Sequence, residues 1–271
     1  GDNNPNGLQN ANTQEFRNKV STVLAKNGEG LAGANYSMGS MAGIHKTHPD
    51  WKIIATESAS PSNSRGIYNT LSQYNKTGDY QCTAYDTNAV SWGNTARESW
   101  WYTIKDDFVS GEFIWTGFDY IGEPTPWNGT DKGSVSGDKL AVPNSSYFGV
   151  IDTAGFEKDS FYFYTSQWRE DKKTLHVVPQ SWNAEDLSIS GGKVPVYVYS
   201  NAAKVELYLN DKLIGTSTRT PITTAAGHEW ATYSNVSNDA DQCTAVNESH
   251  QWKAQAIQFN VKYAEGTLSA K

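Results

Sequence analysis

The sequence predicts two structural portions, a parallel sheet covered by helices and then a β-sandwich. In residues 30–120, helix-like segments alternate with short strands that are apolar along their length, which is typical of an α/β fold. From about residue 171 onward, short segments alternate apolar and polar residues without a helical pattern, which indicates a sandwich. The change falls near 167–173, so we expect one domain over 1–170 and a second over 171–271.

The individual elements follow from hydrophobic periodicity. An apolar stripe of Trp100, Trp101, Ile104 and Phe108 predicts a helix over 95–111. The first portion has three further predicted helices, over 12–30, 41–50 and 63–78. Its predicted strands are 30–38, 51–58 and 111–120.

The second portion contains a clear hairpin pattern. In segment 204–217, Val205, Leu207 and Leu209 point to one side of a strand, because side chains alternate along it. The residues Asn-Asp-Lys that follow at 210–212 predict a tight turn and a returning strand.

Composition argues against several classes of function. The 271 residues carry a net charge of −7 without a lysine or arginine run, which argues against nucleic acids and anionic membranes as partners. No stretch approaches the roughly 20 apolar residues of a membrane span. Cys82 and Cys243 lack metal-ligand spacing, and we expect neither a metal nor a cofactor. The 10 tryptophans, 15 tyrosines and 9 phenylalanines suit flat ligands such as sugars, or large cores.

Three predicted strands end in residues that suit carbohydrate chemistry. Tyr36 follows the first, Glu57 ends the second and Trp115 lies near the end of the third. In α/β barrels, the carboxyl ends of the strands carry the active site. A retaining glycosidase needs a carboxylate nucleophile, a donor that keeps it ionised and a flat apolar surface for the sugar. Glu57, Tyr36 and Trp115 fit these roles in that order; a structural ion pair or cap is the alternative for Glu57.

Four stretches carry a family resemblance. They are IIATESASPSNSRGIY, FVSGEFIWTGFDYIGEPTPW, NSSYFGVIDTAGFEKDSFYFYTSQW and KVPVYVYSNAAKVELYLNDKLIGTS. These stretches closely resemble glycoside hydrolase family 2 in its β-galactosidase-like branch. The resemblance implies the C-terminal half of a TIM (β/α)₈ barrel over 1–170. It also implies an immunoglobulin-like β-sandwich over 171–271, truncated at its C-terminus.

The resemblance also implies roles for single residues. In the family, the nucleophilic glutamate ends the seventh barrel strand, which corresponds to Glu57. A tyrosine at the end of the sixth strand hydrogen-bonds the nucleophile and corresponds to Tyr36. A tryptophan ends the eighth strand and corresponds to Trp115.

Other candidate site residues have structural alternatives. Asp119, Glu123 and Trp127 lie in or beside the matched stretch and are expected to bind substrate. Asp119 alternatively orients a loop or pairs with Arg65. His45 and His48 are interpreted as part of a solvated loop rather than as a metal pair, since no third ligand matches them.

The chain departs from the family pattern at the acid/base. In the family this residue is a second glutamate, preceded by asparagine, at the end of the fourth strand. The opening residues GDNNPN resemble the end of the fifth strand, so the acid/base is expected outside this chain. Asn247–Glu248 falls in the sandwich portion and is no substitute. The rest of the barrel, from a longer polypeptide or a complementing chain, is therefore the expected partner.

The expected function is part of a retaining glycosidase that cleaves terminal β-galactosides through a covalent intermediate on Glu57. Two alternatives stay open: a non-catalytic carbohydrate-binding or interaction fragment, and a portion of a β-glucuronidase or β-mannosidase. The residues Ser58-Ala59-Ser60 favour a galactosidase, because glucuronidase and mannosidase relatives usually follow the nucleophile with an aromatic residue and a glycine.

Overall fold

The computed structural model describes residues 31–71, 80–123 and 145–271. The predicted helix over 12–30, the second half of the predicted helix over 63–78, and Trp127 lie outside the described residues.

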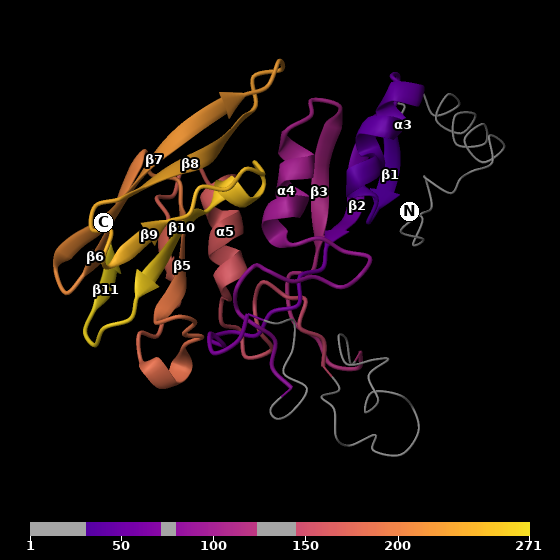
Figure 1. The fold of residues 1–271 in the computed structure, drawn as a ribbon. Helices are drawn as coiled ribbons and strands as arrows, with labels where there is room; N and C mark the ends of the chain where they lie inside the picture. Colours follow the sequence, from indigo (N-terminus) through magenta and orange to yellow (C-terminus); the bar gives the residue numbers. More distant parts are fainter. Residues whose placement is uncertain (1–30, 72–79, 124–144) are drawn as a thin grey trace.

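A three-stranded parallel sheet forms the first part of the described structure (Figure 1). Each strand overlaps a predicted one, although β3 begins at Val109, inside the segment predicted as a helix over 95–111, and β2 lies in the middle. The strands are β1 (Leu31–Asn35), β2 (Lys52–Ala59) and β3 (Val109–Trp115). The helices that accompany them are η1 (Met38–Ser40), α3 (Met41–Thr47) and α4 (Ala96–Ile104).

The two faces of this sheet differ in how completely other side chains cover them. Ala34, Ile53 and Ala55 are buried against the Met38 and Met41 side chains of η1 and α3. On the opposite face, Phe113 remains 64% exposed. A parallel sheet ordinarily has both faces covered. The face that carries Phe113 is called the open face below.

Helix α5 (Asp159–Trp168) is not revealed by the sequence periodicity. Its sequence, DSFYFYTSQW, is largely aromatic, and Phe163 and Tyr164 are buried. A helix that is buried on several sides carries no clear polar stripe, so its periodicity is weak. Figure 1 shows α4 and α5 between the parallel sheet and the sandwich.

The helix predicted over 63–78 is wrong for its described residues, 63–71, which are extended or in turns. Gly66 has a φ of 75°. The Asn63 amide donates to two carbonyl groups in segment 83–85, and the buried Tyr68 hydroxyl donates to a carboxylate at the start of α5. These long-range contacts override the local preference for a helix.

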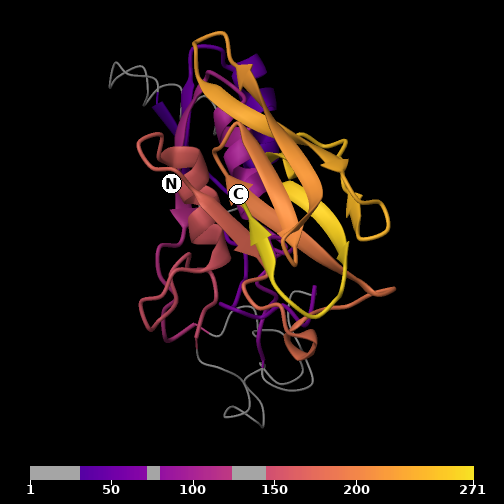
Figure 2. The same ribbon diagram turned by 90° about the vertical axis from the view of Figure 1, so that its left-hand side faces the viewer.

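The predicted β-sandwich is confirmed. Two four-stranded antiparallel sheets pack face to face, with strand orders β4-β5-β10-β9 and β11-β6-β7-β8 (Figure 2). This arrangement fits an immunoglobulin-like sandwich. The strands are β4 (Leu175–Val178), β5 (Lys193–Ser200), β6 (Lys204–Leu209), β7 (Lys212–Thr223), β8 (Glu229–Ser237), β9 (Cys243–Ala245), β10 (Ile257–Lys262) and β11 (Leu268–Ala270). Two 3₁₀ helices are η2 (Ala184–Asp186) and η3 (Lys253–Gln255).

Inward side chains of both sheets form the sandwich core. Val198 of β5, Leu207 of β6 and Phe259 of β10 belong to one buried cluster. The predicted hairpin is confirmed at β6–β7. Asn210 and Asp211 have φ values of 50° and 62°, which a two-residue type I′ turn requires.

Arg97, which forms a buried ion pair within the first portion, also connects α4 to the sandwich. The Arg97 guanidinium pairs with Asp86 at 2.8 Å between Nε and Oδ2, and both side chains are almost completely buried. Arg97 Nη1 also donates to the Lys253 carbonyl oxygen at 3.1 Å. In return, Gln255 Nε2 donates to the Arg97 carbonyl oxygen at 2.7 Å. Because Lys253 and Gln255 belong to η3, α4 and the sandwich are held in a defined orientation.

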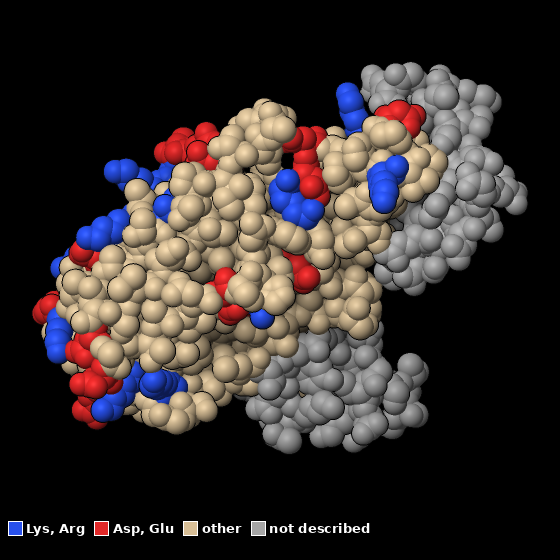
Figure 3. All heavy atoms as spheres, turned by 45° about the horizontal axis from the view of Figure 1, so that its top comes forward, with Lys and Arg blue, Asp and Glu red and all other residues tan. Residues whose placement is uncertain are grey.

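The surface charges are of mixed sign. Figure 3 shows lysine and arginine side chains interspersed with aspartate and glutamate on one face. Exposed pairs such as Arg169–Asp171 contribute little to stability, because water screens them. In the described part of the chain, no helix is long and apolar enough to cross a membrane.

The buried pair yields a stability prediction. Arg97→Ala leaves the Asp86 carboxylate buried without its partner, so the free energy of unfolding should fall by about 3–5 kcal/mol. Chemical denaturation of the chain measures this change. Arg169→Ala, which removes the exposed pair with Asp171, is the matched control and should leave the unfolding midpoint unchanged. Equal losses in the two variants would contradict the role given to Arg97.

Candidate active site

Strand β2 contains a β-bulge beside Glu57. Along β1, Ala34 pairs with Ala55 and Asn35 pairs with Glu57, so β2 has one residue more than β1 at this point, Thr56. An extra residue shifts the alternation of side chains between the two faces of a sheet. Bulges occur next to active sites, where they re-aim a side chain.

The bulge decides the direction in which Glu57 points. Ile53 and Ala55 are fully buried on the helix-covered face, and strict alternation would send Glu57 to the same face. Ser58 takes that place instead and is 0% exposed, whereas Glu57 is only partly buried. Glu57 is therefore turned away from the helices.

The backbone around Glu57 is strained. Tyr36, Ala59 and Ser60 have φ values of 47°, 61° and 67°, a region that residues other than glycine rarely adopt. Such conformations cost on the order of 1–3 kcal/mol each and gather at functional sites. Gly93 supports this turn, because a Cβ atom there would lie 2.3 Å from the Ala59 carbonyl oxygen.

The side-chain hydrogen bonds around Glu57 differ from the predicted ones. The Tyr36 hydroxyl pairs with Ser60 Oγ at 2.8 Å rather than with Glu57. Asn35 Nδ2 donates to Glu57 Oε2 at 3.3 Å. Tyr36 contacts Glu57 through its backbone, whose N–H donates to the Glu57 carbonyl oxygen at 2.8 Å. Burial raises the pKa of Tyr36 far above its usual value, so its hydroxyl stays protonated.

A second group of polar side chains connects Trp115 to Glu123. Trp115 Nε1 donates to the Tyr120 hydroxyl oxygen at 3.2 Å, and that hydroxyl donates to Glu123 Oε2. The Trp115 and Tyr120 rings meet edge to face, with centroids 5.9 Å apart. Burial and the hydrogen bond to Glu123 raise the pKa of Tyr120 to about 12. The Trp115–Thr116 peptide bond is cis.

The side chains around Glu57 interact electrostatically with those around Trp115 and Glu123. Burial raises the pKa of Glu57, and the nearby Glu123 carboxylate raises it further. The same two carboxylates also raise the pKa of Tyr36, after the larger effect of burial. Like charges at close range disfavour simultaneous ionisation. Tyr36, Glu57 and Glu123 thus lie near one another, and Tyr120 links Glu123 to Trp115, so these five residues form one cluster.

Asp119 is occupied by structural contacts. Its carboxylate, 6% exposed, pairs with the Lys158 ammonium group, 1% exposed, at 2.6 Å. It also accepts from the Gly149 backbone N–H at 2.7 Å. This arrangement is typical of a residue that orients a loop, the alternative to the predicted substrate contact. The alternative pairing with Arg65 is wrong, because Arg65 pairs with Asp152.

His45 and His48 each stack on an aromatic ring. His45 stacks on Phe108 with ring centroids 4.0 Å apart, and His48 stacks on Trp51 at 4.1 Å. The interpretation as a solvated loop is wrong for His45, which lies in α3; His48 follows that helix, and both residues are half-buried. Among the described residues, no group of three or more His, Cys, Asp or Glu side chains could hold a metal ion.

Three residues of the cluster are not among the site residues predicted from the sequence: Asn35, Ser60 and Tyr120. Asn35 is the chain neighbour of Tyr36, Ser60 lies three residues after Glu57, and Tyr120 lies inside the matched stretch. Their nearness in sequence to predicted site residues was the signal that could have revealed them. The hydrogen bonds of Asn35 and Ser60 depend on the bulge and on left-handed backbone, which residue spacing does not reveal.

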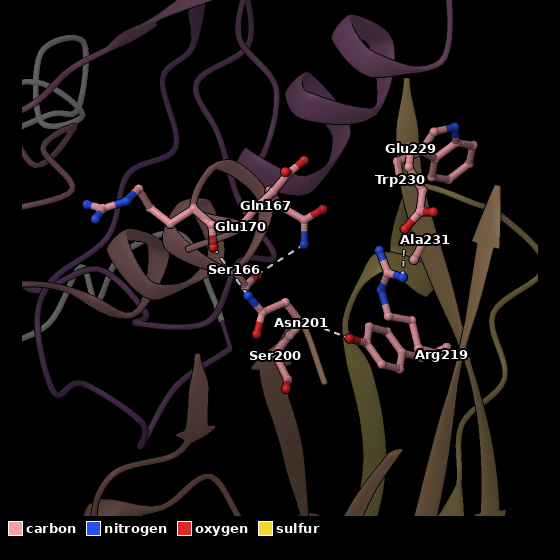
Figure 4. A pocket seen from close by; sticks show the side chains of 11 residues that line it. Ser166, Gln167, Glu170, Ser200, Asn201, Arg219, Glu229, Trp230 and Ala231 are labelled. Carbon is pink, nitrogen blue, oxygen red and sulfur yellow. Dashed lines mark hydrogen bonds and ion pairs between the residues drawn. The ribbon is translucent and has the colours of Figure 1, made fainter. Parts of the chain in front are cut away.

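A separate cavity of about 210 Å³ lies between the end of α5 and strands β7 and β8 (Figure 4). Its polar groups largely bind one another. The Tyr233 hydroxyl donates to the Ser200 carbonyl oxygen at 2.6 Å, and Arg219 pairs with Glu229 at 2.9 Å. The cavity is lined by elements other than those that carry Glu57, and it marks the junction of α5 with the sandwich.

Comparisons with known proteins agree with this architecture. The solved structure of a β-glycosidase from Bacteroides vulgatus matches with a TM-score of 0.61 at 21% identity, over 96% of this chain and 33% of that chain. That match shows a shared fold. A family model described as a domain of unknown function (DUF4982) matches residues 191–271.

Sequence comparison adds closer relatives. Beta-galactosidase BoGH2A of Bacteroides ovatus is 35% identical over 218 residues, which are 76% of this chain and 23% of that protein. The chain belongs to glycoside hydrolase family 2. A putative beta-glucuronidase of Formosa agariphila is 38% identical over 135 residues, or 49% of this chain and 11% of that protein. The chain thus spans a third or less of the length of each of these proteins.

The charge coupling in the cluster yields a prediction. Glu123→Gln removes the negative charge that raises the pKa of Glu57, so this pKa should fall in the variant. A carboxyl-carbon NMR titration of Glu57 in the chain measures the shift. The control is Asp171→Asn, which removes an exposed carboxylate paired with Arg169 and should leave the Glu57 titration unchanged. An unchanged Glu57 pKa in Glu123→Gln would show that the two carboxylates do not interact.

Proposed function

We propose that this chain supplies the nucleophile side of a retaining glycoside hydrolase that cleaves terminal β-galactosides. Residues 1–170 would form the C-terminal half of a (β/α)₈ barrel, and residues 171–271 an immunoglobulin-like domain. The observation that carries the proposal is the bulge in β2, which turns Glu57 away from the covering helices and into a cluster with Tyr36, Trp115 and Glu123.

The cluster supports a division of roles in the reaction. A Glu57 carboxylate oxygen attacks the anomeric carbon, while the bond from that carbon to the leaving-group oxygen breaks and the oxygen takes a proton from the acid/base. Water then displaces Glu57 from the sugar in the second step, and the acid/base accepts the proton of that water. Asn35 stabilises the ionised form of Glu57 by donating a hydrogen bond. Trp115 supplies an apolar ring for the sugar face.

Glu123 is proposed to bind sugar hydroxyl groups. Its carboxylate accepts from Tyr120 and lies close enough to Glu57 to raise the pKa of Glu57. A charged acceptor binds a hydroxyl donor more strongly than a neutral one does. Trp127, which lies outside the described residues, is proposed as an outer wall of the same site.

Galactoside specificity rests on two observations. The residues after the nucleophile, Ser58-Ala59-Ser60, differ from the aromatic residue and glycine expected of glucuronidase and mannosidase relatives. The β-galactosidase of Bacteroides ovatus also matches a longer part of this chain than the putative β-glucuronidase does, 218 against 135 residues.

The proposed mechanism requires a partner for the open face of the sheet. No acid/base glutamate is assigned to this chain, and Phe113 beside Trp115 is 64% exposed. The missing barrel strands, in the same longer polypeptide or in a complementing chain, would cover this face and bring the acid/base to within about 5–5.5 Å of Glu57.

Covalent labelling tests the role of Glu57. Incubation of the completed barrel with a slow fluorinated galactoside should add one sugar mass to a peptide that contains Glu57, because the second step is retarded. Peptide mass spectrometry reads this out. Glu57→Gln should take no label, whereas Glu123→Gln should still be labelled at Glu57. A label on another carboxylate would remove Glu57 from this role.

Activity of the isolated chain tests the need for a partner. Residues 1–271 alone should not turn over nitrophenyl galactoside, because half a barrel cannot hold the reacting groups to the required tolerance. Addition of a chain with the first barrel strands should restore turnover. The lone chain carrying Glu57→Gln is the control for contaminating activity. Turnover by the lone parent chain that this substitution abolishes would show that the acid/base lies within it.

A further inference from the structure

A half-buried glutamate joins three elements behind Glu57. Glu112 lies in β3, and its Oε2 accepts a hydrogen bond from Ser58 Oγ of β2 at 2.8 Å and from Ser99 Oγ of α4 at 2.7 Å. Both serines are 0% exposed. Figure 1 shows β2, β3 and α4 side by side. A single carboxylate oxygen therefore ties two strands and a helix together on the helix-covered face.

This position is an unusual one for a carboxyl group. Ser58 and Ser99 belong to the layer where the sheet packs on α4, and burial there disfavours a charged group. An apolar residue would fill the space without that cost. Two hydroxyl donors offset part of the cost, since buried polar groups are tolerated when they are hydrogen-bonded. The Glu112 carboxyl thus contributes a specific connection rather than apolar packing.

The hydrogen bond between Ser58 and Glu112 lies directly beside the bulge. Ser58 is the residue after Glu57, and it occupies the helix-covered face only because the extra residue shifts the alternation of β2. Ser58 Oγ also lies 3.3 Å from the Phe113 carbonyl oxygen, a second and more distant acceptor in β3 for its one hydroxyl proton. If Ser58 left this face, β2 would return to regular alternation and Glu57 would rotate toward the helices.

We propose that Glu112 is a positioning residue for the nucleophile: its hydrogen bond to Ser58 holds the bulge of β2 in the register that presents Glu57 to the sugar. This inference rests on the proposed function of Glu57. Glu112 touches neither substrate nor the reacting atoms. Its bond to Ser99 fixes α4 to the sheet and contributes to stability without setting the direction of Glu57.

The two serines provide a matched test, because each donates one hydrogen bond to the same oxygen. The experiment uses the complete enzyme that contains this chain, and it measures the rate of Glu57 labelling by a fluorinated galactoside together with the melting temperature. Ser58→Ala and Ser99→Ala should both lower the melting temperature. Only Ser58→Ala should slow labelling, by between about 10-fold and 100-fold, because displacements of about 1 Å have effects of this size.

A pair of Glu112 variants separates the hydrogen bond from packing. Glu112→Gln keeps an oxygen acceptor of the same shape and should retain the parent labelling rate. Glu112→Met keeps the volume without an acceptor and should slow labelling as Ser58→Ala does. The slowing should appear in the maximal labelling rate, with the inactivator concentration at half-maximal rate unchanged.

Three results would overturn the inference. One is parent-like labelling in Ser58→Ala. Another is equal slowing in the two serine variants, in proportion to their loss of melting temperature, which would assign Glu112 to stability alone. A parent enzyme that takes its label elsewhere than Glu57 would remove the proposed function and this inference together. Normal parent labelling with parent-like Ser58→Ala would remove only the inference.

Discussion

The extra residue in β2 is the constraint on which the candidate site depends. A regular strand through Ile53 and Ala55 would direct Glu57 into the apolar layer below the helices, where its charge would be costly to bury. With the bulge, Ser58 fills that place and Glu57 turns away from the helices, where the Glu123 carboxylate raises its pKa. The strained backbone at Ala59 and Ser60 follows directly after the bulge, so several kcal/mol of conformational cost falls on one short segment.

Helix α4 connects this segment to the sandwich. Ser99 on one side of the helix donates to the glutamate behind the bulge, and Arg97 binds the η3 backbone through the Lys253 carbonyl group. The sandwich therefore supports the helix that packs behind β2, the strand that carries Glu57. Through this contact the second portion of the chain stabilises the sheet that carries the cluster, although its own strands carry none of the cluster.

The sequence was sufficient for the strands of the parallel sheet and of the sandwich, but not for the hydrogen bonds around Glu57. Continuous apolar runs predicted β1, β2 and β3 because parallel strands are buried, and the alternating pattern predicted the sandwich. The helix α5 escaped prediction because consecutive residues from Phe163 to Ser166 are all buried, so no polar stripe marks one side of it. The contacts of Tyr36 escaped prediction because they depend on a left-handed backbone at Tyr36 and Ser60. Asp119 looked like a site residue by position, whereas its partner Lys158 is 39 residues away in sequence.

The separation of two carboxyl groups tests the account most directly. In an experimental structure of the complete enzyme with a bound galactoside analogue, the Glu57 carboxyl group should lie on the side of β2 away from α4. The acid/base carboxyl group should lie about 5–5.5 Å from it, across the anomeric carbon. A Glu57 side chain packed against α4 would contradict the account, as would a separation of about 6.5–9.5 Å, the range of inverting enzymes.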